Sequence, residues 1–187
     1  ALSSGLYHLL GKSGQAPALF KPIRVDSTSS HSSPDPDATL FANLQHSTPP
    51  NSLPITIEIK EDTKGLTATT REHILTEFNS LVDKAKNIII EGPAMGKSPE
   101  SSLSVTHDLV KAFNAHVILL VQFSMALKSS DILDMANALG DRLAGIVINR
   151  VPRYRNYQVQ TSLVDPLTEQ GLTIIGVLPE ERCMLGV

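Results

Sequence analysis

Short aliphatic runs that alternate with helix-length amphipathic stretches restrict the fold of this chain more than any other feature. Four runs are rich in Ile, Val and Leu and show no alternation of polar and apolar residues: 87–91, 116–121, 143–148 and 172–177. Strands of this kind are covered on both faces, as happens when helices connect parallel strands. We therefore predict an α/β fold with a doubly wound, mainly parallel sheet in three α/β/α layers.

Helices are predicted where apolar residues recur at helical spacing between these strands. Ser129 or Ser130, followed by Asp131, is a suitable helix start, and Gly171 is a suitable helix end. Upstream, Ala18 begins a further predicted strand. The predicted helices are 1–10, 69–86, 103–114, 130–139 and 156–169.

Residues 26–54 are rich in Ser, Thr and Pro and separate the two halves of the pattern. Such a stretch is typical of a surface loop, so we expect a mobile insertion within a single domain over residues 1–187. Loops that leave the carboxyl ends of strands carry the ligand chemistry in α/β folds. This insertion is therefore a candidate source of site residues.

The charge pattern excludes several classes of partner. The chain has 187 residues and a formal net charge of -3, with acidic and basic residues spread along it. It has no basic stretch for nucleic acid and no apolar run long enough for a membrane span. The single cysteine, Cys183, cannot form an internal disulfide, so a reducing cytoplasm is the expected compartment.

Two segments imitate the phosphate-binding motif G-x-x-x-x-G-K-[ST], in which backbone N–H groups hold phosphates at a helix start. Gly11-Lys12-Ser13 follows a predicted helix, and Leu6 stands where the first glycine belongs, so we interpret it as a helix-ending turn. Residues 92–98 follow a strand, but the spacing is one residue short. A phosphate-binding role for Lys97 is the alternative interpretation.

Several short segments resemble, in order, the dethiobiotin-synthetase-like family, which includes dethiobiotin synthetase and the amino-terminal domain of long phosphotransacetylases. The matching segments are Phe20-Lys21-Pro22-Ile23, Asp35-Pro36-Asp37-Ala38, Ile89-Ile90-Glu91-Gly92, residues 108–121, residues 145–152 and residues 175–180. The resemblance implies a P-loop NTPase-like fold. It also implies that the first strand and the phosphate loop precede Ala1, with residues 1–10 as the helix after that loop.

By this resemblance the chain binds ATP and Mg²⁺. Asp37 and Glu91 match the family's metal-binding carboxylates, and Asp35 competes with Asp37 for that position. Lys21 matches an active-site lysine that could meet phosphate or an acidic small-molecule ligand. Gly92 follows the metal-binding position.

Asn149 and Pro179 match positions around the nucleotide base. An Asn at a strand end is also a common turn former, so both interpretations of Asn149 stay open.

Three functions are compatible with the resemblance. The first is an ATP-binding regulatory domain of a larger protein such as a phosphotransacetylase. The second is an ATP-dependent ligase of the dethiobiotin synthetase or cobyrinate diamide synthase type, and the third is a degenerate interaction domain without nucleotide. The resemblance further implies a homodimer and a further domain in the same longer chain.

Overall fold

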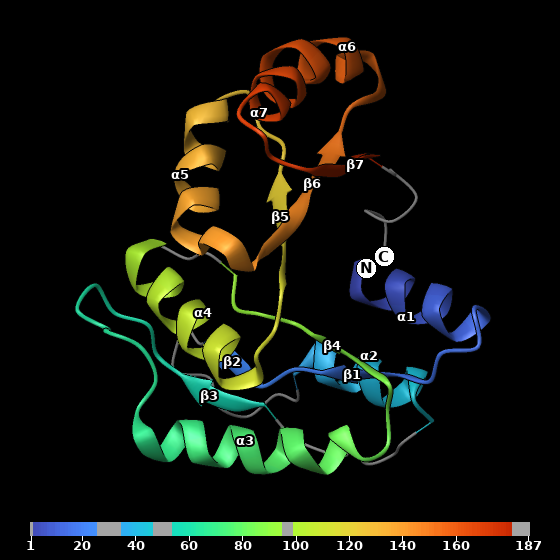
Figure 1. The fold of residues 1–187 in the computed structure, drawn as a ribbon, viewed down its shortest axis with the longest axis vertical. Helices are drawn as coiled ribbons and strands as arrows, with labels where there is room; N and C mark the ends of the chain where they lie inside the picture. The colour runs from blue at the N-terminus through green and yellow to red at the C-terminus, as the bar shows by residue number, and fades with distance from the viewer. Residues whose placement is uncertain (1, 26–34, 47–53, 95–98, 181–187) are drawn as a thin grey trace. The chain divides into compact units, whose positions relative to one another are not determined.

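A computed structural model describes residues 2–25, 35–46, 54–94 and 99–180 (Figure 1). The chain divides into two compact units, residues 1–113 and 114–187, where the sequence predicts a single domain. Every strand pairing among the described residues is parallel, so the predicted α/β class is confirmed. The strands form three small sheets, β1-β4, β2-β3 and β5-β6-β7.

The first unit combines helices with two pairs of parallel strands. An aromatic cluster lies in its interior, where the Phe78 and Phe113 rings are 4.5 Å apart and the Phe20 ring is 5.9 Å from Phe113. The elements are α1 (Leu2–Lys12), β1 (Pro17–Phe20), β2 (Ile23–Val25), α2 (Pro36–Leu44), β3 (Ile55–Ile57), α3 (Ala68–Val82), β4 (Asn87–Ile90) and α4 (Pro99–Phe113).

The second unit is built on three parallel strands. Strand β6 lies in the middle and is the most buried, since Ile146 and Ile148 have no exposed surface. Helix α5 runs alongside β5 (Figure 1). The elements are β5 (Val117–Gln122), α5 (Ser129–Leu139), β6 (Leu143–Val151), α6 (Asn156–Val159), α7 (Asp165–Glu169) and β7 (Ile174–Pro179), with a π-helical turn at Gln160–Val164.

Most predicted elements are present within a few residues of their expected bounds. Gly171 ends the helix before β7 with a φ of 81°, and Gly11 to Ser13 form the end of α1 and the turn after it, as expected. The predicted start of α5 was wrong in detail. Lys128 is the capping residue, and Asp131 accepts a hydrogen bond from its backbone N–H at 3.1 Å.

The interval 26–54 was predicted to be a loop, but residues 36–44 form α2. Asp35 caps this helix and Pro36 occupies its first turn, a combination that favours a helix start. Burial of Ala38, Phe41 and Ala42 then holds the helix to the unit. Residues 26–34 and 47–53 of the predicted insertion lie outside the described residues.

None of the described helices has the length and apolar character required to cross a bilayer.

Candidate functional site

Lys21 and Glu91 leave neighbouring strands at the same edge of a sheet. Strands β1 and β4 are parallel with Phe20 opposite Ile90, and the Glu91 backbone N–H donates to the Phe20 carbonyl at 2.9 Å. Each of the two residues comes directly after its strand. The carboxyl ends of parallel strands are the usual ligand-binding edge of an α/β sheet.

Three carboxylates surround the ammonium group of Lys21. Its Nζ lies 3.3 Å from Asp35 Oδ1 and 3.3 Å from Glu91 Oε1, and it donates a hydrogen bond to Asp37 Oδ2. The Lys21 side chain is only 13% exposed. One positive charge therefore faces three negative ones, and this group (Lys21, Asp35, Asp37 and Glu91) is called the carboxylate cluster below.

Asp35 and Asp37 have different roles in the cluster. Asp35 Oδ1 accepts the backbone N–H groups of Asp37 and Ala38 at 3.0 and 2.9 Å, so this buried carboxylate caps α2. Asp37 lies in the first turn of the helix, and its side chain is 46% exposed. Of the two carboxylates, Asp37 is therefore the one open to a ligand.

The charges of the cluster shift the pKa values of its members. The hydrogen bond from Lys21 lowers the pKa of Asp37. Burial and the Asp37 charge raise the pKa of Glu91, although Lys21 opposes this shift. Burial acts to lower the pKa of Lys21, but the hydrogen bond to Asp37 and the charges of Glu91 and Asp35 outweigh it, so that pKa is raised. Burial is the main reason that the Glu91 carboxyl loses its proton less readily than usual.

The first turn of α1 contacts the same cluster. Ser3 Oγ donates to Glu91 Oε2 at 3.2 Å. The amino end of a helix carries unpaired N–H groups and a partial positive charge that favour anions. Ser3 was not predicted as a site residue, because no sequence motif marks it.

The carboxylate oxygens of the cluster suit a Mg²⁺ ion that takes its remaining ligands from phosphates and water. Asp37 and Glu91 supply hard oxygens, and three carboxylates face one ammonium group, an excess of negative charge that a divalent cation would offset. Within the described ranges no set of three or more His, Cys, Asp or Glu side chains is arranged to hold a metal ion. Mg²⁺ in nucleotide sites commonly takes one or two carboxylates and completes its shell with phosphates and water.

Gly92 follows Glu91 at the edge of the sheet. A Cβ built on Gly92 would meet none of the described residues within 4 Å, apart from its chain neighbours. Lys97, the alternative phosphate-binding residue, lies outside the described residues.

Asn149 and Pro179 belong to the second unit, near the carboxyl ends of β6 and β7. Asn149 Oδ1 accepts the backbone N–H of Arg150 at 2.9 Å, as a turn-forming residue does. Arg150 has a φ of 59°, a left-handed conformation that is uncommon for a residue with a side chain. The structure therefore brings Lys21, Asp37, Glu91 and Gly92 together in the first unit, and describes Asn149 and Pro179 separately in the second.

A family model described as an AAA domain matches residues 1–184. The chain belongs to this AAA domain family. The family is one of P-loop NTPases and includes dethiobiotin-synthetase-like proteins. No curated protein matches the chain. The match spans both units, so this AAA domain is a P-loop nucleotide-binding domain.

Proposed function

We propose that this AAA domain binds ATP with Mg²⁺ at the carboxylate cluster and acts as a regulatory domain of a larger dethiobiotin-synthetase-like protein, such as a long phosphotransacetylase. The observation that carries the proposal is the meeting of Lys21 and Glu91 at the carboxyl ends of two paired parallel strands. The family match supports nucleotide binding in general.

The charges of the cluster suit a metal–phosphate ligand. Lys21 is a point charge on a flexible stem that can turn from Asp37 towards a phosphate oxygen. Asp37 and Glu91 would hold Mg²⁺, and Lys21 would then pair with phosphate. Lys21 and the metal would then share the negative charge of the ligand, which is the main contribution of a protein to phosphate binding.

The amino end of α1 supports the same placement. Ser3 Oγ donates to Glu91, so the first described turn of α1 lies beside the cluster. A G-x-x-x-x-G-K-[ST] segment joined to the start of this helix would add backbone N–H groups at the same place. No described residue other than its chain neighbours would contact a Cβ at Gly92, which supports a close approach of a bound group there.

The remaining assignments come from the resemblance alone. Asn149 and Pro179 are proposed to face the nucleotide base, and a homodimer is the proposed assembly. A regulatory role is favoured over ligase activity because Pro93-Ala94-Met95-Gly96 follows Glu91-Gly92 where dethiobiotin synthetase has a glycine-rich A-G-G segment.

The test is calorimetric titration of the intact protein with ATP, with Mg²⁺ and with EDTA. The proposal predicts saturable, Mg²⁺-dependent binding without turnover when diaminopelargonic acid and bicarbonate are added. Formation of a ligated product would establish the ligase function instead. No ATP binding under either condition would leave an interaction domain as the function.

A further inference from the structure

A continuous helical segment of the second unit is anchored on one side only. A short 3-10 turn (Arg153–Arg155) leads directly into α6, the π-helical turn and α7. Val159, Leu163 and Leu167 lie on the inner face of this segment, and none is more than 1% exposed. Because these side chains fix the segment to the core of the unit, its opposite face is held outward on a rigid support.

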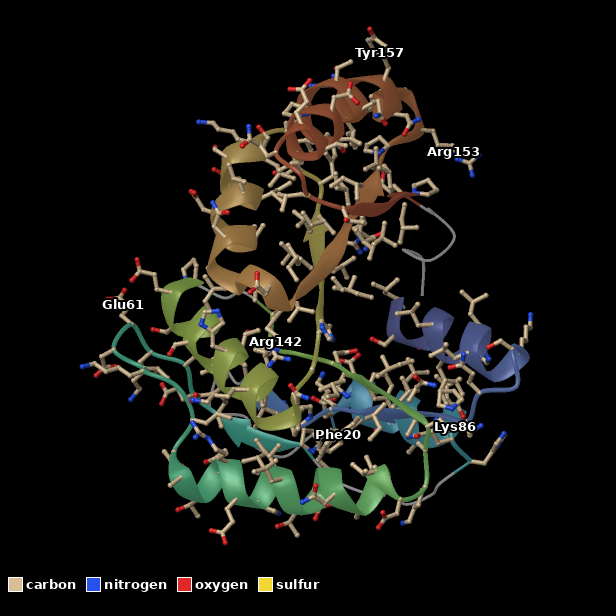
Figure 2. The ribbon with its side chains drawn as sticks, viewed as in Figure 1. Phe20, Glu61, Lys86, Arg142, Arg153 and Tyr157 are labelled. Carbon is tan, nitrogen blue, oxygen red and sulfur yellow. The ribbon has the colours of Figure 1, made fainter. Side chains whose placement is uncertain are left out.

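Two tyrosines stand on that outer face. Tyr154 and Tyr157 are 78% and 82% exposed, more than any other large apolar side chain in the part of the chain that the structure describes. They are three residues apart in helical backbone, so they occupy neighbouring positions on one face. Side chains of Arg153 and Tyr157 point away from the ribbon (Figure 2). Arg153, Tyr154, Tyr157 and the exposed Gln158 are called the tyrosine surface below.

Arg155 supports the Tyr154 ring from the side. Its guanidinium lies 5.3 Å from the centre of the ring, close enough for a cation–π interaction. Its Nη1 donates to Gln158 Oε1 at 2.8 Å, which ties the guanidinium to the helix. Arg155 is therefore a positioning residue for Tyr154.

The sequence around the tyrosine surface is positively charged. Residues 142–164 contain four arginines and neither a lysine nor an acidic residue, although the whole chain has a net charge of -3. Three of these arginines, Arg150, Arg153 and Arg155, lie within residues 150–155. Tyr and Arg are the residue types enriched at the centres of protein–protein interfaces, where Lys, Asp and Glu are depleted. The composition of this surface is thus that of a protein-binding site.

We propose that the tyrosine surface binds an acidic segment of a partner protein. Tyr154 and Tyr157 pack against apolar side chains of that segment, and the neighbouring arginines pair with its carboxylates. Charge complementarity selects the partner, since the surface carries cations and no acidic side chain. A nucleic acid or an anionic membrane needs a longer basic track, and the net charge of the chain opposes both.

The experiment is an NMR titration of the intact protein at an ionic strength of about 0.15 M. The probe is a peptide of Asp, Glu and Leu, and the control probe has Asn and Gln in place of Asp and Glu. The acidic peptide should shift the resonances of residues 153–158 saturably, with a dissociation constant of about 1 mM or lower, and the control peptide should bind at least about fivefold more weakly. Equal binding of the two peptides, or no saturable shift, would overturn the proposal.

Further titrations separate a protein partner from other ligands. Excess ATP with Mg²⁺ should change the affinity for the acidic peptide by less than about twofold, because the tyrosine surface lies outside the proposed nucleotide contacts. Competition by ATP would assign this surface to nucleotide instead. Tighter binding of oligothymidylate or of phosphatidylserine vesicles than of the acidic peptide would make a nucleic acid or a membrane the partner and would contradict the proposal.

Three variants assign the binding to the tyrosine surface. Tyr157→Ala should weaken binding of the acidic peptide about tenfold, as truncation of an interface tyrosine does. Tyr157→Phe keeps the ring and should stay within about threefold of the original protein. Gln158→Glu adds a negative charge next to Tyr157 and should weaken binding about two- to fivefold. Its carboxylate can still accept the hydrogen bond from Arg155, so the fold is preserved.

Gln170→Glu is the matched control. Gln170 is exposed at the end of α7, and it adds the same charge to the same helical segment. It lies about 18 Å from Gln158 along a helix, well beyond the screening length of the buffer, so the affinity should change less than about twofold. Equal weakening by Gln158→Glu and Gln170→Glu would show that the peptide binds through general surface charge. That result, or an unchanged affinity in Tyr157→Ala, would contradict the proposal.

Discussion

Lys21 Nζ lies 3.3 Å from Glu91 Oε1, and these residues immediately follow Phe20 and Ile90, which face each other in parallel strands. The pair therefore depends on the register of β1 and β4. Asp35 and Asp37 approach the same ammonium group from α2. Removal of the lysine would leave three negative charges close together.

We predict that Lys21→Met lowers the free energy of unfolding by about 1–3 kcal/mol. This range lies between exposed and fully buried ion pairs, because the cluster is only partly covered. Urea unfolding measures the change. Lys84→Met is the control, since Lys84 is an exposed residue after α3, and its loss should cost less than about 0.5 kcal/mol. Equal costs for the two variants would contradict the interpretation.

The pKa shifts predict how Glu91→Gln changes the pH dependence of stability. The pKa of Glu91 is raised, so its contribution to stability is fully present below its unfolded value near 4.5 and is lost as pH rises through the higher folded value. Gln does not titrate and avoids this loss. In EDTA, the stability of Glu91→Gln relative to the original protein should therefore rise between pH 4 and pH 7.

Urea unfolding at a series of pH values tests this prediction. Asp37→Asn should behave in the opposite way. The pKa of Asp37 is lowered, so its contribution is present above about 3.8 and is lost as pH falls through the folded value. The stability of Asp37→Asn relative to the original protein should therefore fall as pH rises from the lowered pKa of folded Asp37 to above 3.8. The same direction of change in both variants would mean that the charges of the cluster are wrongly assigned.

Gly65 is required by its contact with Asp108. Its φ is 122°, and a Cβ there would lie 2.3 Å from Asp108 Oδ2. Asp108 cannot easily move, because it accepts the Leu66 N–H at 2.7 Å and pairs with Arg71 at 2.9 Å. We predict that Gly65→Ala costs about 2–4 kcal/mol of stability in thermal or urea unfolding.

A second glycine supplies the control for this prediction. Gly5 lies in α1 and is exposed, and outside its own helix no described residue lies within 4 Å of a built Cβ. Gly5→Ala should therefore raise stability by about 0.5–1 kcal/mol, through higher helix propensity. Destabilisation by both substitutions to a similar extent would refute the role of the Asp108 contact.

The side-chain amide of Gln45 hydrogen-bonds to the backbone of Leu19 in β1, as a neighbouring strand would. Its side-chain Oε1 accepts the Leu19 N–H at 2.9 Å, and its Nε2 donates to the Leu19 carbonyl at 3.2 Å. Leu19 is buried, so Gln45→Ala should leave two buried backbone groups without partners and cost about 2–4 kcal/mol. Gln15→Ala, which removes an exposed contact with Asn87, should cost less than about 0.5 kcal/mol in the same assay. A small cost at Gln45 would show that water replaces its amide.

The strands were predictable because aliphatic runs without polar alternation indicate strands that are buried on both faces of a parallel sheet. Helix α2 was missed because the Ser and Pro content of residues 26–54 outweighed the local signal of Asp35 followed by Pro36. Strands β2 and β3 are only three residues long, too short for a pattern, and their pairing joins Ile23 to Ile55 across a long interval of sequence.

The site was predictable only in part. Lys21 and Glu91 each end a predicted strand, and parallel strands bring such residues to one edge. The capping role of Asp35 and the contact of Ser3 with Glu91 depend on how α1 and α2 pack, which a single sequence does not specify.

The most direct test of the central claim is the Mg²⁺ dependence of ATP affinity in Glu91→Gln. The measurement is titration calorimetry of the intact protein with ATP. Glu72→Gln is the control, since Glu72 is exposed on α3. The original protein and this control should both bind ATP more tightly with Mg²⁺ than with EDTA. Glu91→Gln should remain folded and lose that gain, by about tenfold or more in dissociation constant. An unchanged Mg²⁺ gain in Glu91→Gln would contradict a metal-nucleotide site at the carboxylate cluster.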